Sequence, residues 1–108
     1  MNGDLGQLDQ YLLLAIMRLQ PRAYGVSILD HIKEKTGKNY SVGAVYAALD
    51  RLQGRGYVRD KQGEPTPERG GRRKTYFELT APGQVALQQS LNSLQAMRRG
   101  IRWAEATT

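Results

Sequence analysis

The chain has 108 residues, no cysteine, and 16 lysines and arginines against 10 aspartates and glutamates, which gives a net charge of +6. This length suits one domain with a modest core, and the missing cysteines exclude a disulfide framework and a thiolate metal site. The basic balance favours an anionic partner. No apolar run approaches the ~20 residues of a membrane span, and the N-terminus lacks the basic region of a secretory signal. We therefore expect a cytoplasmic protein.

The first predicted helix runs from Leu5 to Leu19, where leucine and isoleucine recur at helical spacing. Its middle, residues 11–17, is apolar nearly all round, which is typical of a helix buried on two sides. In so short a chain the second side requires another subunit, so we predict a homodimer contact through Leu13, Leu14 and Met17. The alternative is a helix that lies centrally in its own domain.

A second helix is predicted from Gly25 to Lys35, after a break at Pro21. Ile28 and Ile32 are expected to face inward. The only histidine, His31, sits among polar neighbours and is expected to be solvated. A lone histidine makes neither a metal site nor a catalytic pair, so we predict no metal and no cofactor.

The third predicted helix spans residues 41–56 and has clear end signals. Ser41 suits the N-cap position, and Gly56 suits the left-handed residue that follows a helix. The inward stripe is expected to consist of Val42, Val45, Leu49 and Leu52, with Tyr46 at its edge.

The outward face of this third helix carries almost no side chain in its first half, because Gly43, Ala44 and Ala47 are small. A solvated face is usually filled with long charged residues. A helix that must approach a DNA groove with its N-terminal half has the pattern seen here. The alternative is a short surface helix that merely contains alanines.

Two strands are predicted next, over residues 57–62 and 74–80, joined by a loop at 63–73 that is rich in glycine and proline. The far end of the loop is strongly basic and suits a phosphate backbone. The alternative is a solvated charged loop. The cationic residues here are Arg69, Arg72, Arg73 and, at the start of the second strand, Lys74.

The last predicted helix begins after Thr80 as N-cap and runs to about Ala104. At ~30 Å it is as long as a small domain is wide, so its far half needs a partner subunit. We predict that Leu91, Leu94 and Ile101 lie in the dimer interface, and that residues 81–105 form a dimerisation helix.

Three helices, a hairpin and a long helix make an α+β, mainly α, single domain over residues 1–108. Residues 5–80 are predicted to form a winged helix-turn-helix, with the third helix in the DNA major groove and the hairpin as the wing. No nucleophile motif, phosphate loop or paired carboxylates are present, so an enzyme is not expected. The alternative function is a winged helix that binds RNA or a protein without operator specificity.

Three blocks of the sequence also resemble the PadR family of bacterial transcriptional regulators: YGVSILDHI (24–32), SVGAVYAALDRLQGRGYV (41–58) and ERGGRRKTYFELTAPG (68–83). The chain is similar to the short form of that family, which ends after one dimerising helix. The resemblance implies a homodimer, usually a repressor, on a pseudo-palindromic operator. It also implies release of the double-stranded DNA by an aromatic or drug-like effector.

The family's DNA-binding roles carry over to positions at the start of the second helix, in the third helix and in the wing. Trp103, the only tryptophan, is the candidate for stacking on an effector. Its alternative roles are ordinary interface packing or an exposed aromatic. The DNA-binding candidates are Tyr24, Ser41, Gly43, Tyr46, Ala47, Arg51, Arg69, Arg72, Arg73 and Lys74.

Overall fold

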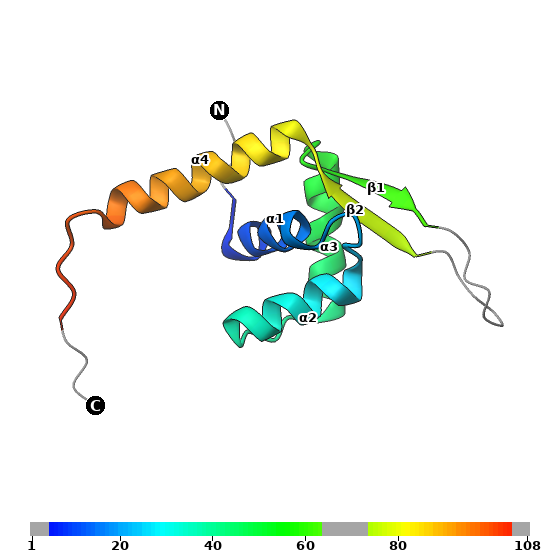
Figure 1. The fold of residues 1–108 in the computed structure, drawn as a ribbon, viewed down its shortest axis with the longest axis horizontal. Helices are drawn as coiled ribbons and strands as arrows, with labels where there is room; N and C mark the ends of the chain where they lie inside the picture. The colour runs from blue at the N-terminus through cyan, green and yellow to red at the C-terminus, as the bar shows by residue number, and fades with distance from the viewer. Residues whose placement is uncertain (1–4, 64–73, 105–108) are drawn as a thin grey trace.

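The computed structural model describes residues 5–63 and 74–104. Within these ranges the chain forms four helices and one two-stranded hairpin (Figure 1). The mainly helical winged helix-turn-helix predicted from the sequence is confirmed. In chain order the elements are α1 (Gln7–Leu19), α2 (Gly25–Thr36), α3 (Val42–Gly54), β1 (Val58–Gln62), β2 (Thr75–Leu79) and α4 (Ala81–Arg98).

Helix α1 lies at the centre of the core, because α2, α3, β2 and the start of α4 all pack against it. Leu13 is 0% exposed and belongs to this core, so the prediction that it contacts a partner subunit is wrong. Its own subunit already covers that side of the helix. Leu14 and Met17 are 42% and 41% exposed, so an apolar edge of α1 does remain on the surface.

The predicted helix starts are confirmed at α3 and α4. The hydroxyl of Ser41 accepts a hydrogen bond from the Ala44 N–H at 3.0 Å, and that of Thr80 accepts one from the Gly83 N–H at 3.1 Å. Gly56 has φ +78°, a conformation that glycine adopts at little cost. Val42 was wrongly placed on the inward stripe. It is 54% exposed, because it lies in the first turn of α3 at the edge of that stripe.

The hairpin is antiparallel, with Val58 paired to Leu79 and Gln62 paired to Thr75. It is also tied to the segment that enters α2, since the Phe77 N–H donates to the Ala23 carbonyl at 2.7 Å. The middle of β2 and the start of α2 are therefore held together by a backbone hydrogen bond and by the isolated bridge between Tyr24 and Tyr76. Residues 64–73, which include most of the predicted basic loop, lie outside the described ranges.

Helix α4 has two different halves. Gly83, Ala86 and Leu87 are buried against the core, whereas the turns after Leu91 are exposed. The prediction that the helix reaches Ala104 is wrong: it ends at Arg98, and Gly100 adopts φ +83° just beyond it.

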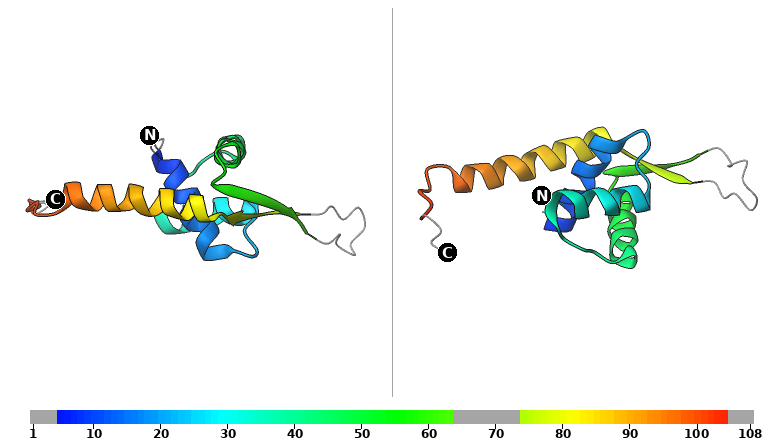
Figure 2. Two further views of the ribbon diagram at one scale, coloured as in Figure 1. Left: turned by 90° about the horizontal axis from the view of Figure 1, so that it is seen from above. Right: turned by 60° about the horizontal axis from the view of Figure 1, so that its bottom comes forward.

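The end of α4 and the hairpin project from the three-helix body in opposite directions (Figure 2). The radius of gyration is 16.2 Å, whereas about 13 Å is expected for a compact domain of this length. The chain is therefore elongated, and within its described part the residues of α4 after Leu91 are exposed.

Candidate nucleic-acid interface

Helix α3 offers an exposed face made of small residues. Ser41, Gly43 and Ala47 are exposed, while the opposite face of the helix is fixed in the core by Val45 and Leu49. The helix therefore cannot rotate without breaking the core. A partner surface can approach the backbone closely at Gly43 and Ala47, because these two residues carry no long side chain. Val42 and Tyr46 are exposed beside them.

Tyr46 connects α3 to the start of α2. Its ring lies over Gly25, where an added Cβ would overlap the Tyr46 hydroxyl. Only glycine permits this close approach. The contact places the phenolic hydroxyl of Tyr46, a residue that is 44% exposed, at the N-terminal end of α2, where orphan amides and the helix dipole favour an anion. Tyr46 thus packs between two helices while its ring remains partly accessible.

Tyr24, the N-cap residue of α2, stands at the base of the wing. Its ring meets that of Tyr76 edge to face, with centroids 5.9 Å apart. The ammonium of Lys74 lies 4.2 Å from the centroid of the Tyr24 ring, close enough for a cation–π contact. Tyr24 and Gly25 therefore connect the wing residue Lys74 to Tyr46 of α3. Three of the predicted DNA-binding residues, Tyr24, Tyr46 and Lys74, are therefore linked by contacts in the fold.

Arg51 has a partner that the sequence prediction missed. Its Nη2 atom lies 2.8 Å from Oδ1 of Asp9 on α1, and the side chains are 59% and 10% exposed. Arg51 was predicted to meet backbone phosphate, but the structure gives its guanidinium an intramolecular role between α1 and α3. One indication of this ion pair was present in the sequence, because Asp9 lies on the face of α1 that is buried. Its partner, 42 residues away, could not be named from spacing.

Comparison with known proteins decides the family. Residues 13–89 match the model of the transcriptional regulator PadR-like family. The chain belongs to the PadR-like family. Most of the described body therefore lies within the matched range, from the middle of α1 to the middle of α4.

Solved structures agree with this PadR-like fold. A PadR family transcription regulator from Clostridium difficile R20291 is 20% identical, with a TM-score of 0.74 over 87% of this chain and 93% of that one. A PadR-like transcription factor from Bacteroides fragilis is 22% identical, with a TM-score of 0.73 over 86% and 84%. RosR of H. salinarum is 20% identical, with a TM-score of 0.68 over 92% and 82%. A search of curated protein sequences gave no significant match.

Two surfaces of this PadR-like chain expose large apolar side chains away from α3. One is the end of α4 and the residues just after it, where Leu94 and Ile101 are exposed and Leu91 is half-buried. The other is the Leu14 and Met17 edge of α1. Their role in a dimer stays a prediction.

Trp103 lies beyond the end of α4 and is 72% exposed. The sequence placed it within the last helix, and the structure corrects that position. Its role in binding an effector stays a prediction. The wing residues Arg69, Arg72 and Arg73 fall outside the described ranges.

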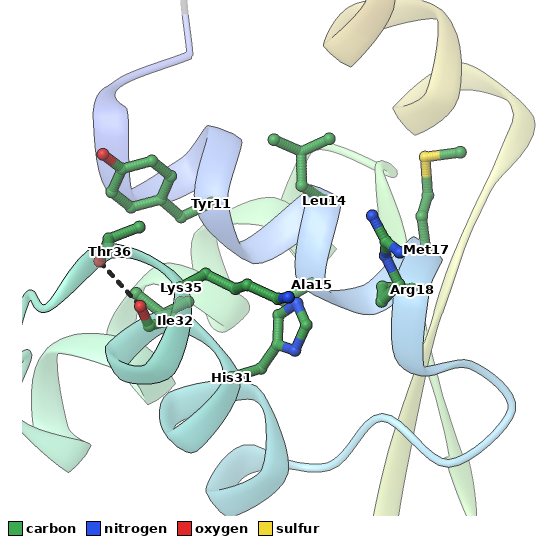
Figure 3. A pocket seen from close by; sticks show the side chains of 9 residues that line it. All are labelled: Tyr11, Leu14, Ala15, Met17, Arg18, His31, Ile32, Lys35 and Thr36. Atoms are coloured by element: carbon green, nitrogen blue, oxygen red, sulfur yellow. Dashed lines mark hydrogen bonds between the residues drawn. The ribbon is translucent and has the colours of Figure 1, made fainter.

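An open groove of ≈ 560 Å³ lies between α1 and α2 (Figure 3). His31 lines it and is half-buried, whereas the sequence led us to expect a solvated side chain. This groove could not be predicted from the sequence, because it forms only where side chains of two helices come together. Its lining residues are Tyr11, Leu14, Ala15, Met17, Arg18, His31, Ile32, Lys35 and Thr36.

Among residues 5–63 and 74–104, no group of three or more histidine, aspartate or glutamate side chains is placed to hold a metal ion. None of the helices described in these ranges is long and apolar enough to cross a membrane.

Proposed function

We propose that this PadR-like chain acts as a homodimeric repressor that binds a pseudo-palindromic operator and is released by a small-molecule effector. The observation that carries the proposal is the exposed face of α3, where Ser41, Gly43 and Ala47 leave the backbone accessible while the other face is locked in the core. A recognition helix approaches base edges with its N-terminal residues.

A face of serine, glycine and alanine has few hydrogen-bond donors for base edges. We therefore propose that sequence choice depends on methyl contacts with thymine and on DNA shape. Phosphate contacts would come from Tyr24 at the start of α2, from Tyr46 of α3 beside it, and from Lys74 at the loop end of β2. The arginines at positions 69, 72 and 73 would add to them.

The dimer is supported by the exposed apolar residues of α4 and α1. Leu94 and Ile101 would contact the partner subunit, together with Leu91 and with the Leu14 and Met17 edge. A two-fold axis through this contact would present two copies of α3 to successive major grooves of one duplex. A dimer that covers two half-sites excludes other proteins from that stretch, which suits repression.

The proposal is tested by selecting bound sequences from a pool of random duplex DNA. We expect a two-fold symmetric motif whose half-sites lie about one helical turn apart, or a multiple of one turn. Its affinity should fall steeply with salt, because several phosphates are neutralised. Enrichment without symmetry would contradict the dimer. Tighter binding of single-stranded RNA than of any duplex would favour the alternative, a winged helix that binds RNA.

A further inference from the structure

The groove between α1 and α2 has an apolar floor. Ala15 and Ile32 form its base and are buried, whereas Leu14 and Met17 form an exposed rim along α1. Figure 3 shows Tyr11 and Thr36 at one end and Arg18 and His31 at the other. Its volume of ≈ 560 Å³ falls within the ~300–1,000 Å³ of sites that bind small molecules.

The charged groups of this groove all have one sign. Arg18, His31 and Lys35 line it, and none of its lining residues is acidic. No carboxylate within residues 5–63 and 74–104 makes an ion pair with Arg18 or Lys35. Asp30 and Glu34 are exposed residues of the same helix, but they do not line the groove. Two cations beside an apolar floor therefore lack an anionic partner in this part of the chain.

These features define the chemistry of a ligand. The flat, apolar part of such a ligand would cover Ala15 and Ile32 and remove them from water. A carboxylate or sulfonate at one end would meet Arg18, Lys35 and the imidazole of His31, because charge-assisted hydrogen bonds to such groups are strong. A neutral molecule would leave these donors without a charged partner, and a cation would be repelled.

We propose that the α1–α2 groove is the effector site and that it binds an organic anion with an apolar, aromatic body. This inference rests on the proposed function, which requires an effector, and it moves the effector site away from Trp103. The groove shares Leu14 and Met17 with the proposed dimer contact. A bound anion therefore lies against the partner subunit and is placed to alter how the two subunits meet.

The test uses two naphthalene dyes that differ in charge. 1-Anilinonaphthalene-8-sulfonate carries a sulfonate, and N-phenyl-1-naphthylamine is its neutral counterpart. Both are titrated into the full chain and followed by fluorescence. We expect the anionic dye to bind once per subunit. Binding should weaken about tenfold or more in the double variant Arg18→Gln with Lys35→Gln, since two charge-assisted contacts are lost. The neutral dye should change less than about twofold.

Two variants serve as controls. Lys33→Gln with Lys38→Gln removes the same charge from exposed positions that do not line the groove, and should leave both dyes unaffected. Trp103→Ala should also bind the anionic dye normally. If Trp103→Ala abolishes binding while the Arg18 and Lys35 variant does not, the site lies at Trp103 and the inference is overturned. Failure of the anionic dye to bind at all overturns it as well.

Operator binding separates this inference from the function on which it rests. The Arg18 and Lys35 variant should still dimerise and bind the selected duplex. If the native chain binds its operator but the dye results fail, only the effector site is wrong. If the chain binds no duplex while the dye results succeed, the groove stands as a site for organic anions and the repressor proposal is overturned.

Discussion

Helices α3 and α4 both present a face that the subunit does not cover, but the two faces differ in kind. The face of α3 is built from Gly43, Ala47 and the N-cap Ser41, whereas the end of α4 carries Leu94 and Met97. Small residues let another surface approach a helix backbone. Large apolar residues gain free energy when another apolar surface removes them from water. Exposure alone therefore does not identify a partner, and the difference in side-chain size is the reason why we propose DNA as the partner of α3 and a second subunit as the partner of α4.

The largest expected effect comes from charging the apolar end of the chain. In the double variant Leu94→Glu with Ile101→Glu, we expect the dimer to dissociate, because two carboxylates would have to be buried at the interface. Operator affinity should fall about 100-fold or more, since two linked half-site contacts become one. Analytical ultracentrifugation and a DNA titration measure both effects. Gln95→Glu, an exposed polar position of the same helix, is the control. A variant that stays dimeric would show that α4 does not hold the subunits together.

The second effect comes from charging the small face of α3. Ala47→Glu adds a long anionic side chain where we propose that DNA lies, so operator affinity should drop about 10- to 100-fold while the fold and the dimer persist. Fluorescence anisotropy with labelled operator measures the loss. Gln88→Glu makes the same charge change on an exposed position of α4 and should have little effect. If the Ala47→Glu variant binds the operator normally, α3 does not enter the DNA major groove.

Replacing Gly25 and Gly43 by alanine, one at a time, should change the free energy of unfolding in opposite directions. Gly25→Ala forces a Cβ against the Tyr46 hydroxyl, so α2 and α3 must separate, at a cost of about 1–3 kcal/mol. Gly43→Ala meets no atom within 4 Å and should stabilise the helix by about 0.5–1 kcal/mol. Urea unfolding followed by circular dichroism compares the two free energies of unfolding. Equal effects would show that Tyr46 does not hold the two helices together closely.

The smallest effect concerns the ion pair between α1 and α3. Arg51→Gln leaves the mostly buried carboxylate of Asp9 without its partner, whereas Asp9→Asn leaves an arginine that water can reach. We expect the first change to cost about 1–2 kcal/mol and the second less, because burial sets the penalty for an unpaired charge. Thermal unfolding of both single variants and the double variant measures the coupling. A larger loss for Asp9→Asn would contradict this assignment.

The sequence predicted those features of the fold that depend on neighbouring residues. Ser41 and Thr80 cap their helices as expected, since a capping hydrogen bond reaches only three residues ahead. The end of α4 was placed six residues too late, because no proline and no strong break precede Gly100. Local propensity alone does not fix where a projecting helix stops.

Features that depend on distant residues could not be predicted. Leu13 was predicted to lie in the dimer interface because its helix is apolar nearly all round, yet Leu13 is fully buried within its own subunit, where several elements pack against α1. The role of Arg51 changed for the same reason, since its partner Asp9 belongs to another helix. The α1–α2 groove also forms only when both helices are in place. The small residues on the face of α3, by contrast, could be predicted, because their spacing in the sequence places Gly43 and Ala47 on one side of the helix.

The pairing of Asp9 with Arg51 has a mechanical consequence. Asp9 and Arg18 lie on the same rigid helix, nine residues and therefore about 13.5 Å apart along its axis. A ligand that tilts α1 at the Arg18 end must either stretch the salt bridge at the Asp9 end or drag α3 with it. Helix α1 thus connects the α1–α2 groove, at Arg18, to α3, at the Asp9–Arg51 salt bridge, and α3 is the helix that we propose binds DNA.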